Sequence, residues 1–187
     1  LSAERLQHKL GDSLEGRQLE VLGSATRTII EQVDTLKAMV NAFSEYARPP
    51  QLELKALDLN VLVEDVAELY QGQSEGPAIE LALASSPPPV NADSGRLRQL
   101  LNNLIRNAIE AVPEPSSCRV TLLTREVRRD DGSTVEAVEL TVRDSGPGFA
   151  AEVLNELFEP YVTTKSKGTG LGLPIVKKIV EEHNGTI

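Results

Sequence analysis

Residues 165–173 read KSKGTGLGL and carry three glycines at steps of two, Gly168, Gly170 and Gly172. They precede and enter an apolar pattern with helical spacing, which predicts a helix over Leu171–His183. At a glycine-rich helix N-terminus, free backbone N–H groups and the helix dipole both favour an anion. Lys165 and Lys167, just upstream, can neutralise phosphate charge, although a solvated loop has the same composition. The segment therefore predicts a phosphate-binding loop.

Two common phosphate motifs do not fit this loop. Its glycine spacing is G-x-G-x-G and a polar loop precedes it, whereas the dinucleotide-binding fingerprint follows a strand. The pattern G-x-x-x-x-G-K-[ST] occurs nowhere in the sequence, which excludes a standard P-loop.

A second stretch, residues 102–111 (NNLIRNAIEA), lies inside a strong helix pattern over Ser94–Val112. Asn103 and Asn107 are four residues apart and share one helix face. Asparagine is a poor helix former, and the flanking residues make this helix apolar nearly all round, which disfavours a plain solvent-facing stripe. Neutral amide oxygens suit Mg²⁺ when phosphates supply the negative charge. The pair therefore indicates a position that faces a ligand.

A third stretch, residues 144–149 (DSGPGF), follows a predicted strand that ends at Asp144. Gly146 and Gly148 allow a tight turn and a close approach of the backbone to a ligand. A carboxylate at this point can accept a hydrogen bond from the exocyclic amine of adenine. Taken alone, an ordinary Asp-Gly turn explains the pattern better. Together with the other two stretches it favours a nucleotide site.

The N-terminal part has a different pattern. Apolar positions at alternating steps of three and four, broken only by Thr26, form a heptad seam: Leu19, Leu22, Thr26, Ile29, Val33, Leu36, Val40, Phe43 and Ala47. They predict a helix of roughly 40 Å that ends before Arg48-Pro49-Pro50. The same step at Ala3, Leu6 and Leu10 predicts the short first arm of a helical hairpin. A dimeric four-helix bundle would complete such a hairpin, and packing on the chain itself is the alternative.

The remaining segments predict an α+β domain with a mainly antiparallel sheet. We expect strands at 52–59, 79–83, 119–127 and 135–143, helices at 60–70 and near 151–157, a hairpin turn at 130–133 and a strand start at 186–187. The 187 residues suit one ordinary domain, or a small module joined to one.

Composition excludes several classes of protein. The net charge of −9 disfavours broad nucleic-acid binding, which needs a basic surface. The single cysteine, Cys118, excludes an intrachain disulfide and is typical of a reduced, cytosolic thiol. No run reaches the length of a membrane span, and no signal-peptide pattern is present.

These motifs together resemble those of a known family. Residues 103–108 (NLIRNA) resemble the N box of sensor histidine kinases, DSGPGF their G1 box, GTGLGL their G2 box, and LFEPYVTTK (157–165) their F box and the start of their ATP lid. Their order and spacing are similar to those of the GHKL (Bergerat) ATP-binding fold, and the details look most like NtrY-type nitrogen-regulation kinases. The resemblance implies a dimerisation and phosphotransfer hairpin over residues 1–50 and a GHKL α/β sandwich over 51–187.

The resemblance also implies roles for the site residues. Asp144 would bind adenine, Asn107 would hold Mg²⁺ with Asn103 assisting, and Phe158 and Tyr161 would anchor the lid hinge. The full set of expected ATP contacts is Asn103, Asn107, Asp144, Gly146, Gly148, Phe158, Tyr161, Thr164, Lys165, Lys167, Gly168, Thr169, Gly170, Leu171, Gly172 and Leu173.

In this family, an acidic residue and then Asn-Pro follow the phosphoacceptor histidine. Neither histidine of this sequence is followed by that pattern. Lys9 and Leu10 follow His8, and His183 precedes Asn184-Gly185, where it suits a helix end charge or cap. We therefore expect a fragment that binds ATP and Mg²⁺ but cannot phosphorylate itself. It would belong to the cytoplasmic portion of a membrane-anchored, homodimeric sensor that passes phosphate to a response regulator.

Two alternatives stay open. One is another GHKL ATPase, in which an acidic residue usually stands at the position of Asn103. The other is a dimerisation or interaction module that binds no nucleotide.

Overall fold

The computed structural model describes residues 5, 9–10, 16–47, 51–72, 76–129, 132, 134–165 and 168–187. It divides into two compact units. The first comprises Leu1–Arg48 with the segment Thr163–Thr169, and the second comprises Pro49–Val162 with Gly170–Ile187.

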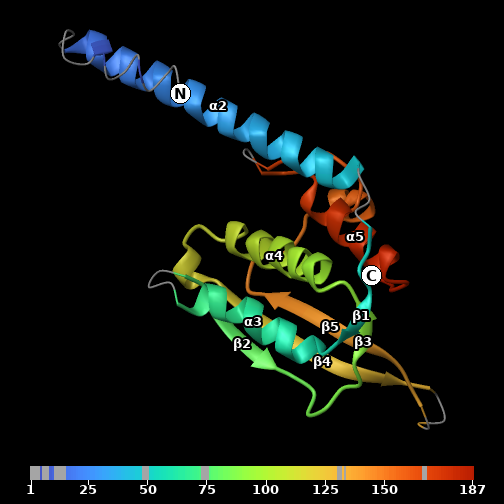
Figure 1. The fold of residues 1–187 in the computed structure, drawn as a ribbon. Coiled ribbons are helices and arrows are strands. Elements are labelled where there is room, and N and C mark those ends of the chain that lie inside the picture. Colours follow the sequence, from blue (N-terminus) through green and yellow to red (C-terminus); the bar gives the residue numbers. More distant parts are fainter. Residues whose placement is uncertain are drawn as a thin grey trace. The chain divides into compact units, whose positions relative to one another are not determined.

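The first unit contains the long helix α2 (Arg17–Ala47, 31 residues) (Figure 1). It begins at Gly16, whose φ of +58° turns the chain and whose carbonyl accepts the backbone N–H groups of Leu19 and Glu20. The predicted long helix is confirmed. The expected first arm, on Ala3, Leu6 and Leu10, lies largely outside the described residues.

The polar residue of the heptad seam is satisfied within its own helix. Thr26 is buried, and its Oγ1 donates to the carbonyl oxygens of Leu22, at 2.8 Å, and Gly23. By contrast, Leu36 and Val40 of the same seam are exposed. In the described part of the chain, no helix combines the length and apolar content needed to cross a bilayer.

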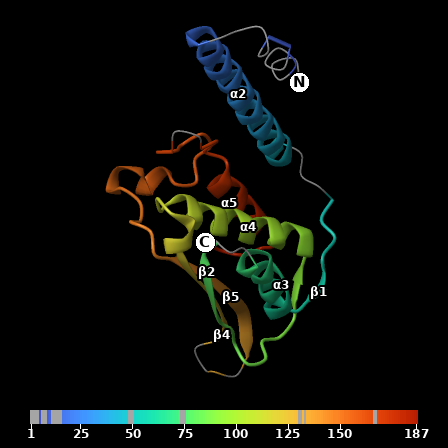
Figure 2. The same ribbon diagram turned by 90° about the vertical axis from the view of Figure 1, so that its left-hand side faces the viewer.

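The second unit is a two-layer α/β sandwich (Figures 1 and 2). Its three-stranded sheet consists of β2 (Ala78–Ala82), β4 (Arg119–Arg128) and β5 (Val135–Asp144). β2 pairs with β4 in parallel, and β4 pairs with β5 in antiparallel. A separate antiparallel pair joins β1 (Lys55–Leu57) to β3 (Val90–Ala92). The predicted mainly antiparallel sheet is therefore confirmed for the described strands.

Three helices form the second layer: α3 (Leu59–Gln71), α4 (Ser94–Glu110) and α5 (Gly172–Glu182). α3 contacts β2 and β4, while α4 packs against both α3 and α5. The core between the layers includes Val63, Val66, Leu101, Ile105, Val120, Leu122, Val176 and Ile179, all fully buried.

Local signals account for the helix ends. Asp58 and Asp93 are the N-caps of α3 and α4, and their carboxylates accept backbone N–H groups of the first turn. α5 ends at Glu182; beyond its C-cap, His183, Asn184 has a φ of +56°, and the N–H of Gly185 donates to the carbonyl of Val180. Asn184 and Gly185 thus terminate the helix with a left-handed residue and a returning hydrogen bond.

Three predicted elements differ from the structure. The strand expected over 52–59 is reduced to Lys55–Leu57, and the short helix near 151–157 is a 3₁₀-helix, η2 (Ala151–Glu156). Residues 185–187 have no regular structure, so the expected strand start is wrong: a strand needs a pairing partner, and no described strand pairs with these residues. In the predicted hairpin turn, Asp130, Asp131 and Ser133 lie outside the described residues.

Candidate nucleotide-binding site

The loop after β5 is shaped by Asp144. Its Oδ1 accepts a hydrogen bond from the backbone N–H of Gly146 at 2.7 Å. A Cβ at Gly146 would lie 2.7 Å from that oxygen and 3.0 Å from Cβ of Ala111, the residue that ends α4. Only glycine therefore lets this loop lie against the end of α4 while the exposed Asp144 keeps its position.

The start of the loop is tied to β4. The backbone N–H of Ser145 donates to the carbonyl of Arg119, and Ser145 Oγ accepts the N–H of Arg119 in return, both at 3.0 Å. Beside it lies Cys118, which is fully buried. Burial, and then the negative charge of Asp144, raise the pKa of its thiol above the ordinary value. The thiol is therefore held in its neutral form.

The two asparagines of α4 have different surroundings. The amide of Asn107 lies beside the first residue of α5: a Cβ at Gly172 would be 3.6 Å from Asn107 Nδ2 and 3.8 Å from Oδ1. Asn103 Nδ2 is buried, and no group among the described residues accepts its hydrogen bonds. A buried, unsatisfied amide is costly, so this atom indicates a position prepared for a ligand.

A neighbouring contact was not predicted from the sequence. The hydroxyl of Tyr70, on α3, donates to Oδ1 of Asn102 at 2.8 Å. Burial raises the pKa of Tyr70, partly offset by the positive charge of Arg106, so the hydroxyl keeps its proton and remains a donor. The bond fixes the turn of α4 that carries Asn103. The only sequence signal for this contact between Tyr70 and Asn102 was the adjacent Asn102-Asn103 pair.

The segment around the predicted lid hinge is closed by backbone contacts. The N–H of Tyr161 donates to the carbonyl of Gly170 at 3.0 Å, and the two residues have φ values of +69° and +66°. A Cβ at Gly170 would lie 2.5 Å from the carbonyl carbon of Tyr161. Phe158 packs under the ammonium of Lys177 on α5, 5.8 Å from the ring centroid. Both predicted hinge residues therefore contact the segment that contains the G-x-G-x-G loop or its helix.

The rest of the predicted lid, Thr163–Thr169, belongs to the first compact unit. Thr163 Oγ1 accepts the N–H of Lys165 at 3.1 Å, and the N–H of Gly168 donates to the carbonyl of Lys165. Thr164 is exposed and Thr169 half-buried. Lys167 lies outside the described residues, and its role stays a prediction.

The second unit brings together, through successive contacts, most of the other predicted residues. Gly146 lies against Ala111 at the end of α4, Asn107 of α4 lies beside Gly172, and Gly170 is bonded to Tyr161. Gly148 has a φ of +75° with open space around it, and Leu173 is half-buried in the first turn of α5. The side chain of Leu171 is 1% exposed and lies in the core, which leaves only its backbone for a ligand.

The donor set has a clear chemical character. No group of three or more His, Cys, Asp or Glu side chains within the described ranges gathers as a metal site. Oxygens of two neutral amides fit Mg²⁺ only when a ligand brings the negative charge, as nucleotide phosphates do.

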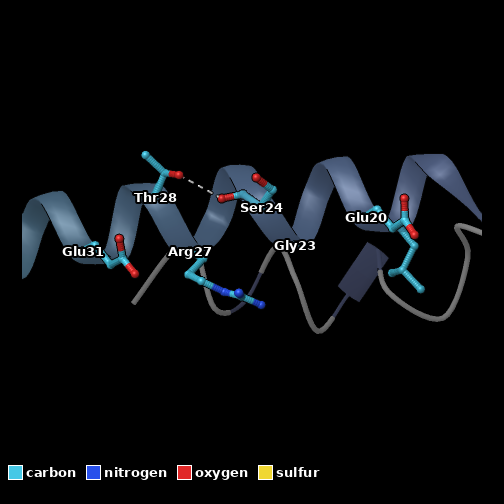
Figure 3. A pocket seen from close by; sticks show the side chains of 7 residues that line it. Glu20, Gly23, Ser24, Arg27, Thr28 and Glu31 are labelled. Carbon is cyan, nitrogen blue, oxygen red and sulfur yellow. Dashed lines mark hydrogen bonds between the residues drawn. The ribbon is translucent and has the colours of Figure 1, made fainter. Parts of the chain in front are cut away.

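A hollow of about 590 Å³ lies elsewhere, along α2 (Figure 3). Its lining is Leu19, Glu20, Gly23, Ser24, Arg27, Thr28 and Glu31. None of the predicted site residues lines it. Size alone does not make it a site, because Asn103, Asn107, Asp144, Gly170 and Gly172 all belong to the other unit.

A glycine-rich helix N-terminus that lies beside an amide-bearing helix, which itself contacts the sheet, is typical of a nucleotide-binding α/β sandwich. The comparison with protein families agrees: residues 92–187 match the family described as histidine kinase-, DNA gyrase B- and HSP90-like ATPase. The chain belongs to this family of ATP-binding domains.

Curated relatives include sensor histidine kinases. The chain is 37% identical over 163 residues to the sensor histidine kinase ZraS of Escherichia coli strain K12, covering 86% of this chain and 33% of ZraS. It is 36% identical over 191 residues to the nitrogen regulation protein NtrY of Azorhizobium caulinodans, covering all of this chain and 24% of NtrY. The chain therefore spans about a third or less of these relatives.

Two solved structures extend the likeness over nearly the whole chain. The histidine kinase ThkA, in complex with the response regulator protein TrrA, is 25% identical with a TM-score of 0.70, covering 98% of this chain and 50% of that one. Full-length ShkA in complex with AMPPNP is 27% identical with a TM-score of 0.64, covering 96% and 40%.

Proposed function

We propose that this chain is the ATP-binding catalytic part of a sensor histidine kinase, most similar to the NtrY type. The observation that carries the proposal is the approach of Gly172, at the glycine-rich start of α5, to the amide of Asn107 on α4. This contact joins a phosphate-binding helix N-terminus to oxygens suited to a phosphate-bound cation. The AMPPNP complex of ShkA adds support by similarity.

Each group then has a chemical task. The Asp144 carboxylate accepts a hydrogen bond from the adenine amine, and the backbone of residues 168–172 donates to phosphate oxygens. Asn107, assisted by Asn103, would hold Mg²⁺, and the bound ion would neutralise charge on the phosphates. Phe158 and Tyr161 anchor the segment that closes over the nucleotide. Gly146, Gly148, Thr164, Lys165, Lys167, Thr169, Leu171 and Leu173 complete the contacts.

The reaction is phosphoryl transfer. The bond between the γ-phosphorus and the oxygen of ADP breaks, and a bond from phosphorus to an imidazole nitrogen forms. The protein contributes mainly positioning and charge neutralisation. The acceptor is a histidine other than His8 or His183, and the phosphoryl group then passes to an aspartate of a response regulator, by similarity to the ThkA–TrrA complex.

We further propose that residues 1–50 are part of the dimerisation and phosphotransfer hairpin and residues 51–187 the catalytic domain. Exposed apolar side chains of the α2 seam, Leu36 and Val40 among them, support this assignment because a second hairpin would cover them. The intact protein would be a homodimer whose kinase part lies on the cytoplasmic side of a membrane.

Calorimetric titration with ATP and Mg²⁺ tests the proposal. The parent chain should bind saturably, Asp144→Asn should weaken ATP binding, and Asn107→Asp should change its Mg²⁺ dependence. Asp65→Asn on α3 and the exposed Asn91→Asp on β3 are matched controls with the same chemical changes away from the site, and they should bind as the parent does. No binding by the parent at millimolar nucleotide would reject the proposal.

A further inference from the structure

Four residues connect the N-terminal end of α4 to the C-terminal end of α5: Asp93 through its backbone N–H, and Arg96, Glu182 and His183 through their side chains. We call them the basal clamp. The two helices run antiparallel, since α4 begins where α5 ends and Asn107 of α4 lies beside Gly172 at the start of α5. The clamp and the proposed nucleotide site are thus at opposite ends of one helix pair, about 20 Å apart at 1.5 Å per residue from Asp93 to Asn107.

The first half of the clamp is an ion pair removed from water. Arg96 donates from Nε and Nη2 to the same oxygen of Glu182, at 3.1 and 2.7 Å, and from Nη1 to Oε1 of Gln99. The side chains of Arg96 and Glu182 are only 8% and 15% exposed. The other oxygen of Glu182, Oε1, is buried and accepts no hydrogen bond among the described residues. Because burial removes the hydration of both ions, such a pair adds little to the free energy of unfolding. Its main effect is to fix the position of Glu182 relative to Arg96.

The second half is a neutral histidine with a fixed tautomer. The backbone N–H of Asp93 can only donate, so His183 Nε2, 3.0 Å away, must be the acceptor. His183 Nδ1 lies 2.7 Å from the carbonyl of Ile179, so it must carry the proton. The ring therefore caps a free carbonyl of α5 with one nitrogen and holds the N-cap residue of α4 with the other. His183 therefore forms the predicted helix cap, and this cap does not require a positively charged ring.

The basal clamp adds directional hydrogen bonds between α4 and α5, which the apolar contacts between these helices do not provide. Buried apolar side chains, such as Ile105 on α4 and Ile175 on α5, hold the helices together by packing and by an attraction that has no direction. Hydrogen bonds to fixed donors strongly oppose sliding of one helix along the other, because a shift of 1 Å breaks them. A shift of α5 would also move Gly172 away from the Asn107 amide.

We propose that His183, with the Arg96–Glu182 pair, is a positioning residue for the nucleotide site: it sets the register of α5 against α4 and so the distance between Gly172 and Asn107. The expected effect of His183 on nucleotide binding rests on the proposed function. Its effect on the register of α5 against α4 concerns the protein without nucleotide.

Three substitutions separate positioning from simple stability. In His183→Gln the amide reaches the place of Nε2, so its oxygen accepts the N–H of Asp93. In His183→Asn the amide reaches only the place of Nδ1 and caps Ile179 alone. His183→Ala does neither. In calorimetric titrations of the full chain, we expect the Gln variant to bind Mg²⁺-ATP as the parent does, and the Asn and Ala variants to bind it about tenfold more weakly.

A second measurement needs no nucleotide. In two-dimensional ¹⁵N NMR spectra, the signals of the Gly172 backbone amide and the Asn107 side-chain amide should shift in the Asn and Ala variants and stay in place in the Gln variant. Ring ¹⁵N shifts of the parent should report the Nδ1–H tautomer.

The outcomes distinguish the two proposals. If the parent binds no nucleotide but the amide signals respond as described, the proposed function fails and the positioning role stands. If the Gln and Asn variants behave alike in both measurements, or if the amide signals ignore all three substitutions, the positioning role is wrong.

Discussion

The backbone N–H of Tyr161 donates to the carbonyl oxygen of Gly170 at 3.0 Å, which joins the two residues that flank the segment Val162–Thr169. Both residues are in the left-handed region, and Gly170 has no space for a Cβ because Tyr161 lies against it. This contact defines the base of the proposed lid by geometry, independently of the position of the lid itself.

Gly170→Ala should therefore damage both stability and binding. The positive φ costs an alanine about 1–2 kcal/mol, and the collision with the Tyr161 backbone adds to that cost. We expect a lower free energy of unfolding in urea and loss of ATP binding. Gly132→Ala is the matched control, since Gly132 has a φ of +71° but open space around it. Equal losses of stability in the two variants would contradict the steric part of the argument.

Gly146→Ala should act on Asp144. The new Cβ would lie 2.7 Å from Asp144 Oδ1, so the carboxylate must turn away from its present position. Loss of one charge-assisted hydrogen bond to adenine should weaken ATP binding about tenfold in a calorimetric titration. Gly72→Ala, at the end of α3 and outside the proposed site, is the control and should have little effect, because the only atom near a Cβ there is the carbonyl oxygen of Glu68 at 4.0 Å. Unchanged ATP affinity in Gly146→Ala would remove Asp144 from the adenine contact.

Asn103→Leu should separate stability from function. The substitution removes a buried amide nitrogen that no described residue satisfies and keeps a similar side-chain volume. The free energy of unfolding of the nucleotide-free protein should stay equal or rise by about 1 kcal/mol, while ATP binding in the presence of Mg²⁺ should fall. A large loss of stability would instead show that Asn103 serves the fold.

Asp93 should contribute to stability in a pH-dependent way. The backbone N–H of Glu53, 3.0 Å from Asp93 Oδ2, is the main cause of a lowered pKa; burial opposes it, and the N–H of Arg96 adds to it. Because the folded pKa lies below the unfolded value of about 3.9, this contribution is present above that pH and is lost as pH falls through the folded pKa.

Urea unfolding of the parent and of Asp93→Asn between about pH 6 and pH 3 tests this expectation. The difference in free energy of unfolding should favour the parent at pH 6 and shrink toward pH 3. A difference that does not change with pH would mean that the carboxylate charge contributes nothing there.

The elements were predictable where their signals are local. Helix periodicity links residues three and four apart, so the ranges of α2, α4 and α5 follow closely from the sequence. The long strands β4 and β5 were likewise predicted, whereas the phosphate-binding role of the glycine-rich loop stays a prediction. Asn103 and Asn107 were found because amides on an otherwise apolar helix have no local explanation.

Contacts between distant segments were not predictable in this way. Asp93 and His183 are 90 residues apart, and no pattern in either segment specifies the other. The same holds for Tyr70 with Asn102 and for Tyr161 with Gly170. The sequence also marked Leu171 as a ligand contact, whereas the packing of α5 on α4 puts its side chain in the core.

The sequence by itself determined which residue types stand at the ends of which helices and strands, and hence the family and the chemistry of the site. Only the tertiary structure decided how those ends meet. Local spacing acts through the backbone over a few residues, whereas the register of α5 against α4, and with it the distance from Gly172 to Asn107, depends on side chains that become neighbours only when the layers pack.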